Sequence, residues 1–282
     1  MNNQLTILNH FKLNLVRPEI DYINNYHLKN IQNNLFDKPY NKIDKRANSL
    51  RSSAAMIYNT IGPKGHIITI DGMDYIVAEY EQTFPALNNV DNADHPHDAQ
   101  LDVSLESVDK TDLIYIEAKC LEWFDAPKSM STAYLSARCY RPETDKNTTN
   151  FIESFRRLRR YPEKEDPKDS SRLLPYYKTY DAIQMNIHIL GIYNYCARGE
   201  AKGVKKIRLM NIVWDYYDAE EYRAEEHEGR KYVAFANKTF KKLFKDLGID
   251  FSVEYVRYSE FLNRVDWSKD IARREYLKRY EI

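Results

Sequence analysis

The feature that most constrains this fold is a pair of predicted strands within residues 101–123, which read LDVSLESVDKTDLIYIEAKCLEW. Apolar and polar residues alternate over 101–106, and this period of two is typical of a strand with one buried face. A polar, charged segment over 107–112 predicts a turn. Residues 113–121 are mostly apolar and rich in β-forming types, so they predict a second strand that returns beside the first.

Two charged residues, Glu117 and Lys119, interrupt the apolar second strand. They point to the same face, because side chains on a strand repeat every second residue. A buried strand rarely carries charges on its inner face unless they are paired or bind a metal. We therefore expect a site in which Asp102 and Glu117 hold a divalent cation and Lys119 stands beside it. The alternative is an edge strand with a solvated Glu-Lys pair.

These residue types suit the hydrolysis of a phosphodiester bond. Mg²⁺ prefers hard oxygen ligands and is usually held by one or two carboxylates together with water and substrate phosphate. The cation lowers the pKa of bound water and stabilises charge on a phosphate under attack. A lysine on the same face can orient that water or neutralise the developing charge. The expected cofactor is therefore Mg²⁺ or Mn²⁺, with Asp102 and Glu117 as its ligands.

An Asp on one strand followed by Glu-x-Lys on the next resembles the PD-(D/E)xK nuclease superfamily, which includes restriction endonucleases and recombination and repair nucleases. The matching residues are Asp102 and Glu117-Ala118-Lys119, and Leu101 stands in the place of the proline, a common departure. The chain looks closest to stand-alone bacterial members. The resemblance implies that Asp102 and Glu117 are metal ligands and that Lys119 is the catalytic lysine.

The resemblance extends over residues 67–215. A helix usually follows the Glu-x-Lys strand in this superfamily, and in some members it carries a Gln or another polar residue that faces the site. Residues 181–196 predict such a helix, with Gln184 and His188 on its polar side. The resemblance implies a site contact for Gln184, whereas His188 is either a hydrogen-bonded core histidine or a general base. Residues 206–214 then predict the strand that should follow.

Further carboxylates could join the site. Residues 66–81 predict a hairpin around an Asp-Gly turn, and Glu79 and Glu81 share one face of its second strand. One of them could supply a third carboxylate, or both could belong to a solvated strand end. Some members of the superfamily carry an acidic residue shortly after the lysine, and Glu122 has that place here.

Any contact with DNA must come from local basic patches, because the formal net charge is zero, with 42 basic and 42 acidic residues. The strongest patch lies on a helix predicted over residues 149–161, opposite its apolar side. Its members are Arg156, Arg157, Arg159 and Arg160. Arginine clusters suit phosphate backbones, and a solvated helix face is an equal alternative.

Three cysteines, odd in number and far apart, predict a reduced cytoplasmic protein without a disulfide framework. No signal peptide or membrane-spanning run is recognised, so no membrane partner is expected. The 282 residues are expected to form one domain. Its parts are a helical N-terminal extension over 1–62, a catalytic core over 63–215 and a C-terminal α/β completion over 216–282. Within the completion, residues 219–247 predict a helix interrupted near Gly229.

The sequence thus predicts an α/β fold with a mixed central sheet flanked by helices, and the resemblance implies that this fold is restriction-endonuclease-like. The expected function is metal-dependent hydrolysis of DNA by a restriction-type or defence-associated endonuclease, with a homodimer among the assemblies considered. Two alternatives stay open. One is a non-catalytic nucleic-acid-binding protein on the same fold. The other is a protein-interaction module whose acidic strand residues form only salt bridges.

Overall fold

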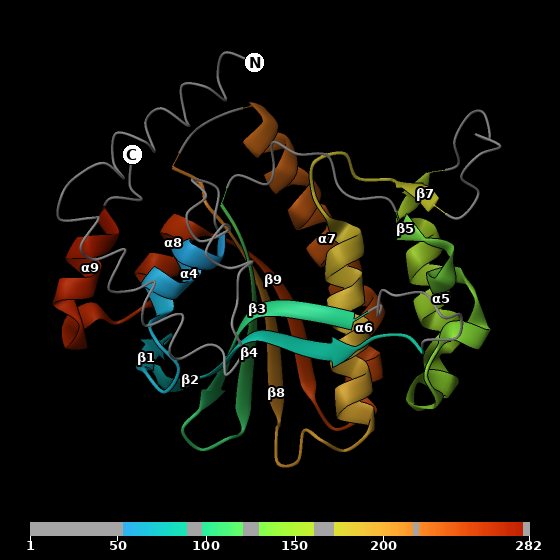
Figure 1. Cartoon of the computed structure of the whole chain (residues 1–282), viewed down its shortest axis with the longest axis horizontal. Coiled ribbons are helices and arrows are strands. Elements are labelled where there is room, and N and C mark those ends of the chain that lie inside the picture. The colour runs from blue at the N-terminus through green and yellow to red at the C-terminus, as the bar shows by residue number, and fades with distance from the viewer. Residues whose placement is uncertain (1–52, 89–97, 121–129, 161–171, 217–219, 279–282) are drawn as a thin grey trace, which may run out of the picture.

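The computed structural model describes residues 53–88, 98–120, 130–160, 172–216 and 220–278 (Figure 1). Of the N-terminal extension expected over 1–62, only the part from Ser53 onward is described, and it forms helix α4 (Ser53–Ile61) and the start of the loop after it. Glu122, one of the candidate carboxylates, lies outside the described residues.

A curled, mixed six-stranded sheet forms the centre of the fold, in the order β1-β2-β3-β4-β8-β9 (Figure 1). Its strands are β1 (Ile67–Ile70), β2 (Met73–Pro85), β3 (Asp98–Ser107), β4 (Asp112–Lys119), β8 (Lys206–Val213) and β9 (Asp250–Arg257). The first four are antiparallel neighbours, whereas β4, β8 and β9 run parallel. The predicted mixed sheet is therefore confirmed.

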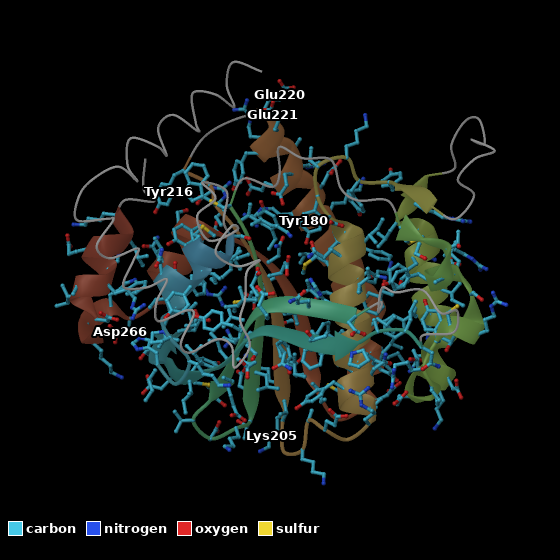
Figure 2. The ribbon with its side chains drawn as sticks, viewed as in Figure 1. Tyr180, Lys205, Tyr216, Glu220, Glu221 and Asp266 are labelled. Carbon is cyan, nitrogen blue, oxygen red and sulfur yellow. The ribbon has the colours of Figure 1, made fainter. Side chains whose placement is uncertain are left out.

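Helices connect the parallel strands, because parallel neighbours need a crossover that returns the chain to the same end of the sheet. Helix α6 (Ala182–Ala197) precedes β8, and α7 (Glu220–Lys245) leads from β8 to β9. Figure 2 shows Lys205, just before β8, and Glu220, at the start of α7, at opposite ends of the molecule. All residues of β8 after the first are buried, as expected of a parallel strand covered on both faces.

The two faces of the sheet are covered by different helices. Alternate side chains of β9 show this, because Tyr255 bonds to Glu225 of α7 whereas Glu254 pairs with Arg264 at the end of α8 (Tyr258–Arg264). Helix α6 lies on β2 and β3 beside α7, and α4 lies on β3 and β4. The hydrogen bond between Thr60 and Tyr258 joins α4 to α8.

Shorter elements surround this core. They are α5 (Thr148–Arg157), α9 (Ile271–Leu277), the strands β5 (Met130–Ser131), β6 (Arg159–Arg160) and β7 (Arg172–Pro175), and the 3₁₀ helices η2 (Thr132–Leu135), η3 (Ala137–Cys139), η4 (Pro142–Asn147) and η5 (Trp267–Lys269). The strands β5, β7 and β6 form a small second sheet. Among the described residues, no helix combines the length and the apolar character that crossing a bilayer requires.

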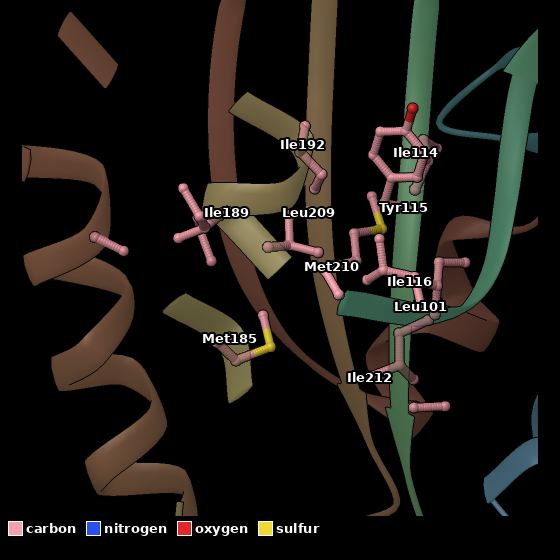
Figure 3. Close-up of a cluster of buried hydrophobic side chains, with 14 of the residues drawn as sticks. Leu101, Ile114, Tyr115, Ile116, Met185, Ile189, Ile192, Leu209, Met210 and Ile212 are labelled. Atoms are coloured by element: carbon pink, nitrogen blue, oxygen red, sulfur yellow. The ribbon is translucent and has the colours of Figure 1, made fainter. Parts of the chain in front are cut away.

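Helix α6 packs close to the sheet at Gly191. Its side chains Met185, Ile189 and Ile192 lie against buried strand residues such as Leu209 (Figure 3). The close approach depends on Gly191, where an added Cβ would lie 2.7 Å from the Ala99 Cβ and 2.9 Å from the Phe84 Cβ. Such contacts are shorter than van der Waals packing allows, so a small residue is needed here. Gly191 thereby brings α6 close to β2 and β3.

Two predicted helices differ from the structure. The helix expected over 149–161 begins at Thr148 and ends at Arg157, because the chain then turns to pair β6 with β7. The helix expected to break near Gly229 is continuous through it. Gly229 faces the ring of Tyr255, and an added Cβ would collide with that ring. This glycine therefore permits close packing of α7 on β9 and does not interrupt the helix.

Candidate active site at the end of strand β4

Asp102 and Glu117 come together because β3 and β4 are antiparallel neighbours. The register pairs Val103 with Ile116, which places Asp102 opposite Glu117. The main-chain N–H of Ala118 donates to Asp102 Oδ2 over 2.6 Å. The structure therefore brings the two carboxylates to one place, at the carboxyl end of β4.

Lys119 and Gln184 complete a closed set of contacts around Glu117. The Lys119 ammonium donates to Glu117 Oε1 over 2.7 Å and to Gln184 Oε1 over 2.8 Å. The Gln184 amide in turn donates to Glu117 Oε1 over 2.8 Å. Each of the three side chains thus fixes the position of the other two, and Glu117 itself is almost fully buried.

His188 lies one helical turn beyond Gln184 and also faces Glu117. Its Nε2 is 3.2 Å from Glu117 Oε2, but the alignment is not that of a hydrogen bond. The ring is buried. His188 therefore lies against Glu117 as a buried polar neighbour on α6.

The start of α6 determines where Gln184 and His188 lie. Asp181 is the N-cap residue, and its carboxylate accepts a hydrogen bond from the Gln184 N–H over 3.0 Å. From that start, a spacing of four residues places Gln184 and His188 on one face of the helix. Together with the close packing at Gly191, this cap directs both side chains onto the end of β4.

The two carboxylates have opposite shifts in pKa. Burial alone would raise the pKa of Glu117, but the charge of Lys119 and the neighbouring His188 lower it to about 2. For Asp102, burial and the charge of Glu117 raise the pKa well above its usual range. Glu117 is thus held as a carboxylate, while Asp102 resists ionisation unless a further positive charge lies beside it. This is the pattern expected of two acids that share one small space.

The carboxylate oxygens of the site could bind a cation. Asp102 Oδ1 accepts no hydrogen bond from the described residues, and the contact of Glu117 Oε2 is with His188 Nε2 at 3.2 Å. Within the same residues, no group of three or more His, Cys, Asp or Glu side chains is arranged to hold a metal ion. Mg²⁺ needs fewer protein ligands than that, since water and phosphate usually complete its octahedron. Two carboxylates therefore fit Mg²⁺ or Mn²⁺, if water and substrate phosphate supply the remaining ligands.

The two glutamates of β2 differ in their relation to this site. Glu79 pairs with Lys64 at 2.5 Å, whereas Glu81 accepts a hydrogen bond from Gln100, and its charge contributes to the raised pKa of Asp102. Glu81 also has a left-handed backbone, with φ of 52°, which is uncommon for a residue with a side chain. Of the two candidates for a third carboxylate, Glu81 is the one that lies nearer to Asp102.

The predicted arginine patch is divided between two elements. Arg156 and Arg157 are exposed on α5, and they pair with Glu153 at 3.8 and 3.2 Å. Arg159 and Arg160 follow in strand β6, and the side chain of Arg160 lies outside the described set. The single helical face expected for four arginines is therefore wrong, because the helix ends at Arg157.

Three polar residues near the site, of which Asn211 and Glu225 are buried, were not predicted as part of it. Asp181 has its pKa raised by burial, and Asn211 of β8 donates to the Glu117 main-chain oxygen over 3.1 Å. Glu225 of α7 accepts a hydrogen bond from Tyr255, and burial raises its pKa to about 8. A signal for Glu225 was present, because it falls in the buried stripe of α7 at helical spacing from Tyr222.

No protein-family model, no curated protein and no solved structure matches this chain. The geometry around Glu117 is therefore the basis of any functional conclusion.

Proposed function

We propose that this chain is a metal-dependent nuclease that hydrolyses DNA phosphodiester bonds on a restriction-endonuclease-like fold. One observation carries the proposal. Asp102 and Glu117 lie on neighbouring strands, and Lys119 is bonded to Glu117 beside them. Asp102 Oδ1 accepts no hydrogen bond from the described residues, and Glu117 Oε2 faces the His188 ring at 3.2 Å. Asp102 and Glu117 would hold Mg²⁺ or Mn²⁺, and Lys119 would be the catalytic lysine.

The residues of the chain have distinct roles in this proposal. When bound, the cation supplies an activated water and a positive charge for the phosphate. The Lys119 ammonium is held by Glu117 and Gln184 beside the two carboxylates, where its charge can stabilise a phosphate oxygen or orient the attacking water. Gln184 accepts from Lys119 and donates to Glu117, and it thereby holds both charges in place.

One observation favours the non-catalytic alternative. Glu117 already has Lys119, Gln184 and His188 around it, and such a network can hold α6 on the sheet without any substrate. A binding protein or interaction module would need nothing more from these residues. Cation-dependent cleavage of DNA distinguishes the two functions. A nuclease shows it, whereas a protein in which this network is purely structural does not.

The test uses supercoiled plasmid and linear duplex DNA with Mg²⁺ or Mn²⁺, and EDTA in a parallel reaction. We expect cleavage with the cation alone and its loss in Glu117→Gln. The matched control is Glu106→Gln, which makes the same change on the same strand as Asp102 but outside the network. Cleavage by Glu117→Gln at the rate of Glu106→Gln, or a wild type that cuts neither substrate, would contradict the proposal.

A further inference from the structure

A single carboxylate on α7 holds the loop that leads into α6. Glu228 Oε2 accepts hydrogen bonds from the main-chain N–H groups of Lys178, Thr179 and Tyr180 over 3.0, 2.9 and 3.0 Å. The Thr179 hydroxyl adds a fourth over 2.9 Å. Three successive N–H groups that converge on one point form an anion-binding nest. Here the anion is supplied by the chain itself, from a helix that begins 40 residues later than Tyr180.

This contact lies directly before the residues that direct α6. Asp181 follows Tyr180, caps the helix and accepts from the Gln184 N–H. The next residue of α7, Gly229, allows the helix to lie against the rings of Tyr180 and Tyr255. Figure 2 shows Tyr180 beside α7, well away from Glu221 at the beginning of that helix. Glu228 and the packing of Tyr180 at Gly229 therefore both hold this loop against α7.

We infer that Glu228 is a positioning residue for the candidate active site, acting through the nest at 178–180 and the Asp181 cap to hold Gln184 against Glu117 and Lys119. Its carboxylate is half-buried and has no contact with those three side chains. Charge-assisted bonds to several N–H groups are the strong kind, so the loop has little freedom while they last. Loss of the carboxylate would leave three N–H groups and a hydroxyl without an acceptor.

A purely structural role and a positioning role predict different results. Glu228→Ala removes the carboxylate but keeps the N–H groups of 178–180 that bind it. A small carboxylate from solution can then bind to these N–H groups in its place. Added acetate should then restore the position of Gln184. A residue that matters only for folding would give a loss that acetate does not restore. The matched control is Glu221→Ala, which removes the same charge from an exposed position on the same helix.

The first readout does not need catalysis. The side-chain amide of Gln184, assigned in a ¹⁵N-labelled sample by comparison with Gln184→Leu, should move toward the values of a free glutamine in Glu228→Ala. Acetate at constant ionic strength should return it, and chloride should not. In Glu221→Ala the resonance should stay at its wild-type position. A Gln184 resonance that is the same in Glu228→Ala and wild type overturns the inference.

The second readout rests on the proposed function. With Mn²⁺ and DNA, kcat of Glu228→Ala should fall by roughly 10- to 100-fold with KM unchanged, as is usual when a supporting hydrogen bond is removed. Acetate should raise that kcat and leave wild type unaffected. If the amide responds but wild type cuts no DNA, the positioning role stands and the nuclease proposal fails. If wild type cuts DNA and Glu228→Ala changes neither the Gln184 amide resonance nor kcat, the nuclease proposal stands and the positioning role of Glu228 fails. Should Glu228→Ala not fold, Glu228→Gln gives the same two readouts, with a smaller loss and no acetate effect.

Discussion

Lys119 and Gln184 are 65 residues apart in the sequence, yet the Lys119 ammonium donates to the Gln184 side-chain oxygen over 2.8 Å. This bond joins the end of β4 to the first turn of α6. Because Gln184 also donates to Glu117, its amide orientation is determined by both charged neighbours. The relationship distinguishes a positioned lysine from an ordinary strand ion pair, since the ammonium has a second acceptor that fixes its direction.

Lys119→Met should stop cleavage without removing the metal ligands. A lysine that stabilises the transition state contributes on the order of 10²-fold or more to the rate. Mn²⁺ affinity, measured by calorimetry, should stay close to that of wild type, because Lys119 is not a ligand. Lys64→Met is the control, since it removes a lysine that pairs with another glutamate, Glu79 of β2. A Lys119→Met protein that cuts as fast as this control would remove Lys119 from the mechanism.

Stability should depend on pH through Glu225. Its pKa is about 8 in the folded protein against a usual value of 4.5. Between these values the unfolded state has lost the proton that the folded state keeps, so stability falls as pH rises, by about 1.4 kcal/mol per pH unit. Glu225→Gln cannot ionise and should lack this decline.

Urea unfolding at pH 6 and pH 7 measures the difference. The free energy of unfolding of Glu225→Gln should gain about 1.4 kcal/mol relative to wild type over that interval. Glu221→Gln, on an exposed site of the same helix, should follow wild type. Parallel pH profiles for wild type and Glu225→Gln would show that Glu225 is ionised in the folded protein at both pH values.

Gly191→Ala should destabilise the protein by about 1–3 kcal/mol, the usual cost of overpacking a core. The added methyl would meet Ala99 at 2.7 Å and Phe84 at 2.9 Å. Helix propensity alone favours Ala over Gly by up to about 1 kcal/mol, so the sign of the change tests the packing. The double variant Gly191→Ala with Ala99→Gly should recover part of the stability in chemical unfolding. A more stable Gly191→Ala would mean that α6 does not press on the sheet.

Arg156 and Arg157 should contribute to DNA binding through their charge. Each ion pair with a phosphate that is removed lowers the slope of log affinity against log salt by about 0.9 for duplex DNA. Replacement of both arginines by Ala should therefore flatten the slope by up to about 1.8, measured by fluorescence anisotropy in EDTA. The control is the pair Lys202→Ala and Lys205→Ala, two exposed lysines that precede β8. If the salt-dependence slope is the same for the arginine and the lysine double variants, Arg156 and Arg157 belong to a solvated helix face that does not contact DNA.

The local sequence pattern was sufficient to predict the two strands that carry Asp102, Glu117 and Lys119. The period of two around Asp102 and the parity of Glu117 and Lys119 place these three residues correctly, because the turn between them is short and their pairing is sequential. The polar contact of Gln184 came from a family resemblance, and the structure places its amide between Glu117 and Lys119.

The remaining features depend on contacts between distant parts of the chain. The end of α5 at Arg157 follows from pairing of the next residues with β7, and no local signal requires it. Gly229 is explained by close packing on the ring of Tyr255 in β9, which local sequence does not show. Glu228 belongs to the acid-rich sequence EEYRAEEHE, where nothing local marks the one carboxylate that binds a loop 50 residues away.

The central claim is that Asp102 and Glu117 together bind a divalent cation. The most direct measurement is the anomalous scattering of Mn²⁺ in soaked crystals of the wild-type protein and of Glu117→Gln. We predict one strong peak in wild type within about 2.0–2.3 Å of an oxygen of each carboxylate, as is usual for oxygen ligands of such ions. The peak should be absent from Glu117→Gln. Wild-type crystals with no peak between Asp102 and Glu117, at a Mn²⁺ concentration that saturates binding in solution, would contradict the account.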